Sequence, residues 1–322
     1  MYFSLGKKSD VYNALITGRS GSGKSTLLNN IIVGIAKKYD ASQLRLYLMD
    51  YRQGVEFKDF ENHPNCEKIF LDNSDIGAAH RLIDDFVSLI EERGKIFSQA
   101  GVRDIYGYNR LNHEKPMHWV VLIIDEVQRL FDGSQAKFNA QIIRIVREGR
   151  GFGIHIIFST QTLIGVDIDR QIMSQVTLRI SLRLNSEADA QKTFAYGNNA
   201  ALKLKQFELI YNTGGGLSDA NQFGRTNSID TDAIKPILAH IVQDRPQHLC
   251  IKPQIVSTHG TNQNQPIISA SMNSTNTEPS LDSKEVEEIN QKNDEYAASL
   301  EDQKKIADYW LNKANQPKGD KE

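Results

Sequence analysis

Residues 18–26 constrain this chain more than any other stretch, because they read Gly-Arg-Ser-Gly-Ser-Gly-Lys-Ser-Thr. The pattern G-x-x-x-x-G-K-S, with Thr behind it, is that of a phosphate-binding P-loop. The short, mostly apolar segment 12–17 predicts a buried strand, and apolar residues recur at helical spacing over 27–38. A strand, a glycine-rich loop and a helix in this order are the context that the motif requires. The sequence therefore predicts a nucleotide-binding site.

Each part of the motif has a predicted role. The glycines let backbone N–H groups close around phosphate oxygens, and the helix N-terminus adds partial positive charge. Lys24 can reach the β- and γ-phosphates of ATP, and the Ser25 hydroxyl can bind Mg²⁺. The predicted ATP-binding residues are Gly18, Arg19, Ser20, Gly21, Ser22, Gly23, Lys24, Ser25 and Thr26.

A second motif supplies the acidic residues that ATP hydrolysis needs. Residues 119–124 form an apolar run, which predicts a central parallel strand buried on both faces. Asp125 and Glu126 follow it directly. We predict that Asp125 binds Mg²⁺ with its water shell and that Glu126 polarises the water that attacks the γ-phosphate. Two acids after a strand also suit an ordinary loop start or helix cap, but the P-loop upstream favours the catalytic interpretation.

Strands and helices alternate along the rest of the chain. Predicted strands cover 44–49, 153–160, 176–184 and 207–211, and predicted amphipathic helices cover 76–100 and 136–148. The alternation predicts an α/β fold with a mostly parallel central sheet and helices on both faces. Ligands of such sheets bind at the carboxyl edge.

Gln161 follows the strand 153–160 and is the third predicted catalytic residue. Its side chain is placed to sense the γ-phosphate or to orient water; the alternative is a surface glutamine. His155 lies inside the same strand, so we predict a packed core histidine rather than a ligand.

Composition excludes several classes of protein. A net charge of −2 gives no overall basic surface for nucleic acid, so any such surface has to be local. Cys66 and Cys250 are far apart and form no metal-binding pattern, which predicts reduced thiols. No stretch approaches the roughly 18 apolar residues of a membrane span, and the N-terminus is no signal peptide. We expect a cytoplasmic protein that a partner can bring to a membrane.

Several stretches together resemble the FtsK/SpoIIIE-type ATPases of the FtsK–HerA superfamily. The most specific is EGRGFGIHIIFSTQT at 148–162, which is similar to the family's G-R-x-x-G-I-H-x-x-x-x-T-Q segment. The resemblance covers about residues 10–230, with its motifs in the family's order. The other matching stretches are the P-loop itself, LYLMDYRQGVEF at 46–57, ERGKIFSQAGVRDIYGYN at 92–109, VVLIIDE at 120–126 and FELIYNTGGG at 207–216.

The resemblance implies a RecA-like fold and a homo-hexameric ring with ATP bound between subunits. Lys24, Ser25, Asp125, Glu126 and Gln161 would stand on one side of the nucleotide. A neighbouring subunit would supply an arginine finger, for which Arg81 is the candidate, with Arg147 and Arg150 as competitors. Rings of this family thread double-stranded DNA, and those of the secretion branch move protein.

Two positions depart from the DNA-pumping members of the family. Thr162-Leu163 stands where Arg-Pro is common, and Arg52 stands where Lys is usual. We find no C-terminal winged-helix module, and the chain begins a few residues before the P-loop strand. The chain is therefore expected to be the C-terminal part of a larger protein, the product of a split gene, or a free-standing motor whose partner brings the rest. Chromosome segregation is not implied.

Three functions stay open at this point. The first and favoured one is a translocase that moves double-stranded DNA, driven by ATP hydrolysis. The second is a secretion-type ATPase that moves protein. The third is a nucleotide-gated regulatory subunit of a larger complex with little turnover. The intact motifs argue against the third.

Three regions are expected along the chain. Residues 1–250 form the RecA-like P-loop ATPase domain. Residues 251–281 form a polar linker, expected to be disordered because it is rich in Thr, Asn, Gln and Ser and poor in aromatic residues. Residues 282–322 carry a predicted amphipathic helix with Asp282 and Glu285 as a capping box. This helix either docks a protein partner or is a solvated tail helix.

Overall fold

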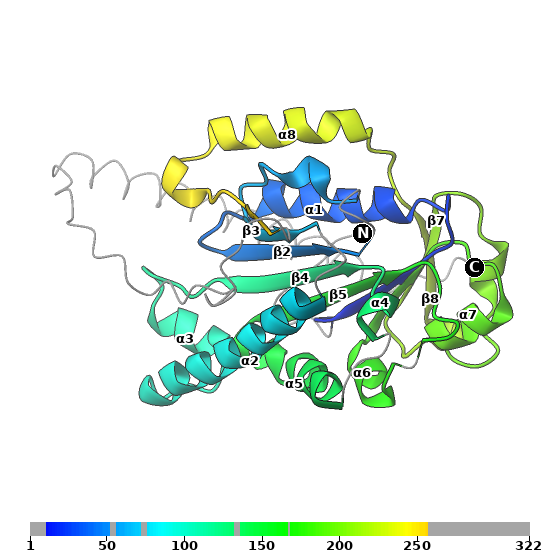
Figure 1. Ribbon diagram of the computed structural model, residues 1–322, viewed down its shortest axis with the longest axis horizontal. Coiled ribbons are helices and arrows are strands. Elements are labelled where there is room, and N and C mark those ends of the chain that lie inside the picture. The colour runs from blue at the N-terminus through cyan, green and yellow to red at the C-terminus, as the bar shows by residue number, and fades with distance from the viewer. Residues whose placement is uncertain (1–10, 52–55, 72–75, 132–135, 167, 257–322) are drawn as a thin grey trace, which may run out of the picture. The chain divides into compact units, whose positions relative to one another are not determined.

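Nine strands form one sheet at the centre of the part of the chain that the computed structural model describes, residues 11–51, 56–71, 76–131, 136–166 and 168–256 (Figure 1). Their order is β8-β7-β6-β1-β5-β4-β2-β3-β9. All strand pairs are parallel, including β1 with β6, except β6 with β7 and β7 with β8, which are antiparallel. The predicted α/β class with a mostly parallel sheet is confirmed. The strands are β1 (Ala14–Thr17), β2 (Leu44–Asp50), β3 (Cys66–Phe70), β4 (Trp119–Asp125), β5 (Ile154–Thr160), β6 (Leu178–Ser181), β7 (Glu208–Asn212), β8 (Asn221–Arg225) and β9 (Gln254–Val256).

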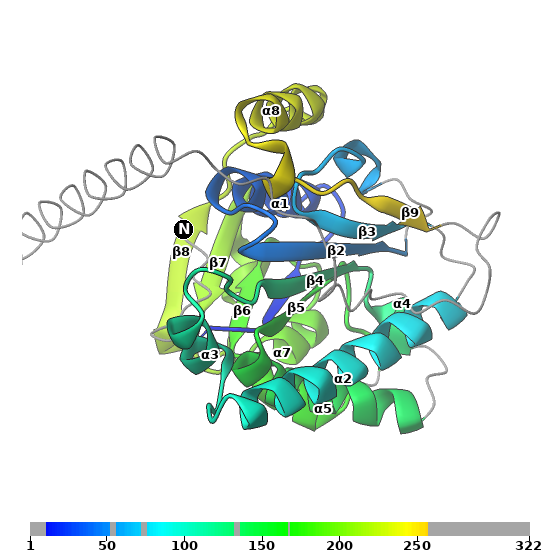
Figure 2. The ribbon, with the colours of Figure 1, turned by 90° about the vertical axis from the view of Figure 1, so that its left-hand side faces the viewer.

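Helices cover both faces of the sheet, as Figures 1 and 2 show from two sides. α1 and α8 lie on one face, and α2 and α5 lie on the other. The helices are α1 (Lys24–Lys38), α2 (Ile76–Gln99), α3 (Ile105–Leu111), α4 (Gln128–Phe131), α5 (Ala136–Phe152), α6 (Arg170–Gln175), α7 (Glu187–Thr193) and α8 (Thr231–Asp244). Short 3-10 turns cover Lys58–Phe60, Ala200–Lys203, Ser218–Ala220 and Gln247–Leu249. Among the described residues, no helix combines the length and the apolar character that crossing a bilayer requires.

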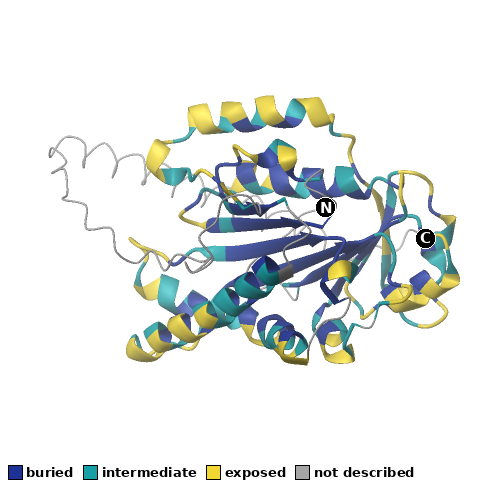
Figure 3. Cartoon of the chain, in the orientation of Figure 1, coloured by how far each residue is buried: buried dark blue, intermediate teal, exposed yellow. Residues whose placement is uncertain are grey.

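The inner strands are buried on both faces, which explains their uninterrupted apolar sequences (Figure 3). Successive side chains of a strand point to opposite sides, so β4 serves two cores. Val120, Leu122 and Ile124 pack with α2 and α5, whereas Val121 and Ile123 pack with α1. This double burial fixes β4 in the middle of the sheet.

Three strands are missing from the sequence-based prediction, and each has a physical reason. β3 carries the charged pair Glu67 and Lys68 in its middle, and β8 contains Phe223 as its one large apolar residue. β9 is short, lies beyond residue 250 in the chain and pairs with β3. The sheet therefore continues past the expected domain boundary, and the prediction of a disordered linker is wrong for β9. The rest of that linker from residue 257, and the predicted tail helix, lie outside the described residues.

The sheet brings the predicted motifs to one edge. β5 lies between β1 and β4. In its register, Thr17 of β1 stands beside Thr160 of β5, and Phe158 stands beside Ile124 of β4. Because all three strands run parallel, the segments that follow them emerge together at the carboxyl edge of the sheet.

Candidate active site

The P-loop connects β1 to α1 in a conformation that glycine permits. Gly21 and Gly23 have φ values of 73° and 105°. The Ser22 N–H donates to the Arg19 carbonyl at 3.1 Å, which closes the turn. Gly23 is the N-cap of α1 and has no side chain to bond the first N–H groups of the helix, so these donors face the loop. The loop therefore has the donors and the helix terminus that a phosphate group requires.

Gly23→Ala is expected to distort this loop. An added Cβ would lie 2.6 Å from Cδ1 of Phe207, and the φ of 105° disfavours any side chain. We expect the unfolding free energy to fall by about 1–3 kcal/mol and ATP affinity to fall about tenfold. Denaturant unfolding and titration with a fluorescent ATP analogue measure the two effects.

Gly34→Ala in α1 is the matched control, because nothing lies within 4 Å of the Cβ that it would add. This variant should be neutral or up to about 1 kcal/mol more stable. Equal behaviour of the two variants would show that the P-loop tolerates a side chain at residue 23.

Lys24 lies at the centre of a buried polar cluster. Its Nζ donates to Oδ1 of Asp125 and, at 3.1 Å, to Oγ of Ser159. The nearest oxygen of Glu126, Oε1, is 3.8 Å away. Lys24 is 4% exposed and Asp125 is fully buried, so the pair is shielded from solvent. Ser159 also donates to Asp125 Oδ1 at 2.7 Å, which fixes one side of this carboxylate.

The second oxygen of Asp125, Oδ2, is buried and has no hydrogen-bond partner among the described residues. Burying a carboxylate oxygen without a partner is costly, so this atom marks a place for a cation or a donor. Ser25 supplies a hydroxyl in the first turn of α1. Hard cations such as Mg²⁺ prefer these oxygen ligands and accept one carboxylate plus substrate phosphates. No cluster of three or more His, Cys, Asp or Glu residues suited to a metal occurs in the described ranges.

Glu126 adopts a left-handed backbone conformation with φ of 53°. For a residue with a side chain this costs about 1–2 kcal/mol, and such strain persists where surrounding bonds over-determine it. Here the N–H of the next residue, Val127, donates to the carbonyl of Ser159 at 2.9 Å. The bend points the Glu126 carboxylate toward Gln161 and Gln128.

Two glutamines hold that carboxylate. Nε2 of Gln161 donates to Oε1 of Glu126 at 2.5 Å, and Nε2 of Gln128 donates to Oε2 at 2.7 Å. The backbone N–H of Gln161 lies 3.3 Å from Oε2. The sequence pointed to Gln161 but not to Gln128, which begins the short helix α4. A polar side chain two positions after the acidic pair is the one sequence signal for it.

The loop that follows Gln161 is bonded to α7. Oδ1 of Asp189 accepts hydrogen bonds from Oγ1 of Thr162 at 2.7 Å and from the N–H of Leu163 at 2.9 Å. Nζ of Lys192 donates to the carbonyl of Val166 at 2.9 Å. No pattern in the sequence predicts these contacts. They hold the loop against α7 near both its ends.

The structure thus brings Lys24, Asp125, Glu126 and Gln161 into one connected network, and Ser25 follows Lys24 at the start of α1. Arg81 does not join it. It lies on α2, which follows β3, and β5, β4 and β2 stand between β3 and the P-loop strand β1. Because an arginine finger acts on a neighbouring subunit, its role stays a prediction.

The two competing arginines lie on α5. Arg147 is exposed, and the Arg150 guanidinium lies 4.7 Å from the centre of the Tyr12 ring. His155 is buried, its Nδ1 bonds the Tyr12 carbonyl at 2.8 Å, and burial lowers its pKa to about 4. The predicted core role of His155 is confirmed.

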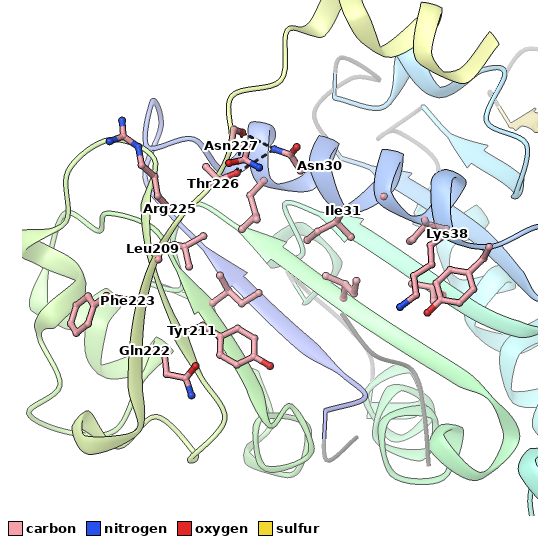
Figure 4. A pocket seen from close by; sticks show the side chains of 18 of the residues that line it. Asn30, Ile31, Lys38, Leu209, Tyr211, Gln222, Phe223, Arg225, Thr226 and Asn227 are labelled. Atoms are coloured by element: carbon pink, nitrogen blue, oxygen red, sulfur yellow. Dashed lines mark hydrogen bonds between the residues drawn. The ribbon is translucent and has the colours of Figure 1, made fainter. Parts of the chain in front are cut away.

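A groove of about 860 Å³ lies elsewhere, between α1 and the hairpin of β7 and β8 (Figure 4). Its walls include Ile31 of α1 and Tyr211 of β7, and Asn30 bonds the Asn227 carbonyl at 2.8 Å across one end. Neither Asp125 nor Glu126 lines it. The groove is therefore separate from the acidic residues for which we predict phosphate chemistry.

Comparison with known proteins agrees with this geometry. The sequence model of the FtsK/SpoIIIE family matches residues 2–202. The ESX secretion system protein EccC of Geobacillus thermodenitrificans is 28% identical over 204 residues, which are 62% of this chain and 14% of that protein. The DNA translocase SftA of Bacillus subtilis is 31% identical over 183 residues, 56% of this chain and 19% of that protein. The chain thus spans less than a fifth of the length of these two curated relatives.

A solved structure shows the same fold. It contains ATPases 2 and 3 of EssC from Geobacillus thermodenitrificans, with a TM-score of 0.63 and 19% identity, over 76% of this chain and 46% of that one. The likeness confirms the predicted P-loop ATPase fold. It is too distant in sequence to carry a substrate from one protein to the other.

Proposed function

The chain belongs to the FtsK/SpoIIIE family of P-loop ATPases, and from this premise we propose that it is an ATP-driven translocase that moves double-stranded DNA through an oligomeric ring. The observation that supports ATP hydrolysis is the network of Lys24, Asp125, Glu126 and Gln161 at the sheet edge. The choice of DNA as the substrate is supported by the similarity to the DNA translocase SftA. Each residue type that phosphoryl transfer to water requires from one subunit is present and in contact with the next.

The residues divide the work of hydrolysis between them. The Lys24 ammonium binds the β- and γ-phosphates, and the P-loop N–H groups bind the remaining phosphate oxygens. Mg²⁺, held by Ser25 and Asp125, supplies neutralisation of phosphate charge when bound. Glu126 accepts the proton of the attacking water, whose oxygen bonds to the γ-phosphorus while the bond to the β–γ bridging oxygen breaks. Gln161 orients that water or bonds the γ-phosphate.

The arginine that stabilises the transferring phosphoryl group would come from a neighbouring subunit of a ring. We propose a homo-hexamer in which Arg81, or else Arg147 or Arg150, reaches the nucleotide of the adjacent subunit and stabilises the charge of the transferring phosphoryl group. We expect this assembly to act in the cytoplasm, with residues 282–322 available to a protein partner. The proposed contact with DNA is to phosphates and is independent of base sequence.

A secretion-type ATPase that moves protein is the second candidate. The observation that favours it is the 28% identity to EccC, which lies close to the 31% identity to SftA. A regulatory subunit with little turnover is less well supported, because no residue of the proposed catalytic set is replaced.

Linear duplex DNA is expected to stimulate ATP turnover at low salt, and the stimulation should fade as salt rises. The reason is counterion release: with about six phosphate contacts, DNA affinity falls about 10³-fold between roughly 50 and 200 mM salt. Steady-state ATPase rates across a salt series, with and without DNA, measure the effect.

Glu126→Gln serves as the blank in this assay. If DNA leaves the ATPase rate unchanged and a secreted peptide raises it, the protein-moving proposal replaces the DNA proposal. The absence of turnover under all conditions would favour the regulatory subunit. Mass photometry with ATP tests the ring, because a hexamer has six times the mass of the 36.3 kDa chain.

A further inference from the structure

Phe207 lies beside the P-loop in a backbone conformation that aromatic residues rarely adopt. It directly precedes β7 and has a φ of 67°. Among the described residues other than glycine, only Glu126 shares this left-handed conformation. For a bulky residue such an angle is an outlier, which persists only where the surrounding bonds hold it. Phe207 is therefore kept in its place against a local strain, and no step of ATP hydrolysis described above uses its side chain.

Two backbone hydrogen bonds fix the position of Phe207. Its N–H donates to the carbonyl of Ser22 in the P-loop at 2.9 Å. Its own carbonyl accepts from the N–H of Thr226, the residue after β8, at 2.9 Å. Phe207 thus joins the P-loop to the hairpin of β7 and β8, and the position of its ring relative to the P-loop is set by these bonds.

The ring of Phe207 lies against the glycine that begins α1. A Cβ added to Gly23 would lie 2.6 Å from Cδ1 and 3.2 Å from Cε1 of the ring, so this edge of the ring faces the P-loop. Phe207 is half-buried and does not belong to the buried core. None of the aromatic pairs found among the described residues includes it. Part of the ring therefore stays accessible next to the predicted phosphate site.

The strand order tells which end of a nucleotide this ring would meet. Gln161 and Glu126, the residues assigned to the γ-phosphate and the water, follow β5 and β4. These strands lie on one side of the P-loop strand β1, and β6 and β7 lie on the other. A triphosphate bound with its γ-phosphate at Glu126 has its nucleoside at the opposite end. Phe207 stands on that side, before β7.

The chemistry of the ring suits a nucleotide base. A base presents a flat π-face, and aromatic side chains stack on such faces with useful affinity. Lys24 and the N–H groups of the P-loop bind phosphate oxygens, which an inorganic phosphate chain offers as well. A ring that is already held in place adds affinity for the base without a large cost of ordering.

We propose that Phe207 stacks on the base of the bound nucleotide, which is adenine in ATP, and so forms the nucleoside end of the site. This inference rests on the ATP binding that belongs to the proposed function and names a further residue for it. Because the ring binds the base and not the phosphates, its removal weakens the binding of ATP and spares the binding of inorganic tripolyphosphate.

Isothermal titration of the full chain with ATP and with inorganic tripolyphosphate, both as magnesium complexes, tests the proposal. Phe207→Leu keeps an apolar side chain beside Gly23 but removes the π-face, and Phe207→Tyr keeps that face. The affinity of Phe207→Leu for ATP should fall about 5–100-fold, and its affinity for tripolyphosphate should stay within about twofold. Phe207→Tyr should keep both affinities. A role limited to supporting the P-loop predicts equal losses for the two ligands.

Phe223→Leu is the matched control. Phe223 belongs to the same hairpin, but it is 68% exposed in β8 and lines the groove beside α1. This variant should bind both ligands as the wild type does. The stacking role would be overturned, with the ATPase proposal intact, by an unchanged ATP affinity in Phe207→Leu, by equal losses for both ligands, or by the same loss in Phe223→Leu.

A fluorescence measurement on Phe207→Trp gives a second, independent readout. An indole stacked on a base loses emission, so ATP should quench this variant more than the wild type, whose Trp119 and Trp310 supply the background. Tripolyphosphate should cause no such quenching, and equal responses to the two ligands would refute the stacking. A wild-type chain that binds ATP without turnover would count against the proposed hydrolysis alone. A wild-type chain that binds neither ligand would overturn both proposals.

Discussion

The Lys24→Ala variant is expected to lose ATP turnover and most of its affinity for ATP. The ammonium is the one side-chain cation in the described network that is placed to bind the β- and γ-phosphates. Losing bonds between a cation and phosphate costs about 3 kcal/mol, or roughly 100-fold in Kd. Turnover should fall further, by about 10³-fold, because charge on the phosphoryl group grows in the transition state. Titration with a fluorescent ATP analogue and steady-state kinetics measure both.

Lys24→Ala also removes the counter-ion of a fully buried carboxylate, Asp125. Breaking a buried pair in this way destabilises a protein by about 3–5 kcal/mol, so the Tm should fall as well. Lys37→Ala is the control, because Lys37 is exposed at the end of the same helix. A folded Lys24→Ala protein that binds ATP with wild-type affinity would contradict the P-loop assignment.

Glu126→Gln is expected to separate binding from chemistry. The amide keeps the size of the side chain but cannot take a proton from water, so kcat should fall about 10²–10⁴-fold. Affinity for ATP should change little, because the P-loop and Lys24 remain. A trapped ATP-bound state should therefore accumulate, and filter binding with radiolabelled ATP followed by product analysis detects it.

Glu148→Gln provides the comparison for that variant. Glu148 is exposed on α5, where it pairs with Arg144 at 3.2 Å, and the change should leave kcat unaltered. Normal turnover in Glu126→Gln would show that another group is the base. The geometry also predicts a structural effect, since a neutral residue 126 no longer attracts Lys24.

The sequence predicts the parts of this site that are contiguous in the chain. The P-loop, the acidic pair after an apolar strand and Gln161 after another strand are local patterns, and parallel strands bring their ends to one edge. Each predicted strand was found, because burial on both faces of a sheet leaves a run of apolar residues. Of the three strands that were not predicted, β8 is the clearest case, because its mostly exposed residues carry little of that signal.

Contacts between residues that are distant in the chain could not be predicted from local sequence patterns. The bond from Gln128 to Glu126 depends on the left-handed backbone at residue 126, and no sequence pattern encodes that angle for a glutamate. The bonds from Asp189 to the loop after Gln161 join residues that lie more than twenty positions apart. Arg81 poses a different problem, because its proposed target belongs to another copy of the chain.

Hydrogen bonds attach α7 to the loop that follows Gln161. Asp189 and Lys192 form hydrogen bonds with the loop of residues 162–166 near both its ends. Both residues belong to α7, a helix of seven residues. A short helix bends far less than a loop, so we expect the loop and the helix that is bonded to it to move together. We therefore expect a displacement of Gln161 by a nucleotide phosphate to be transmitted through these bonds to α7.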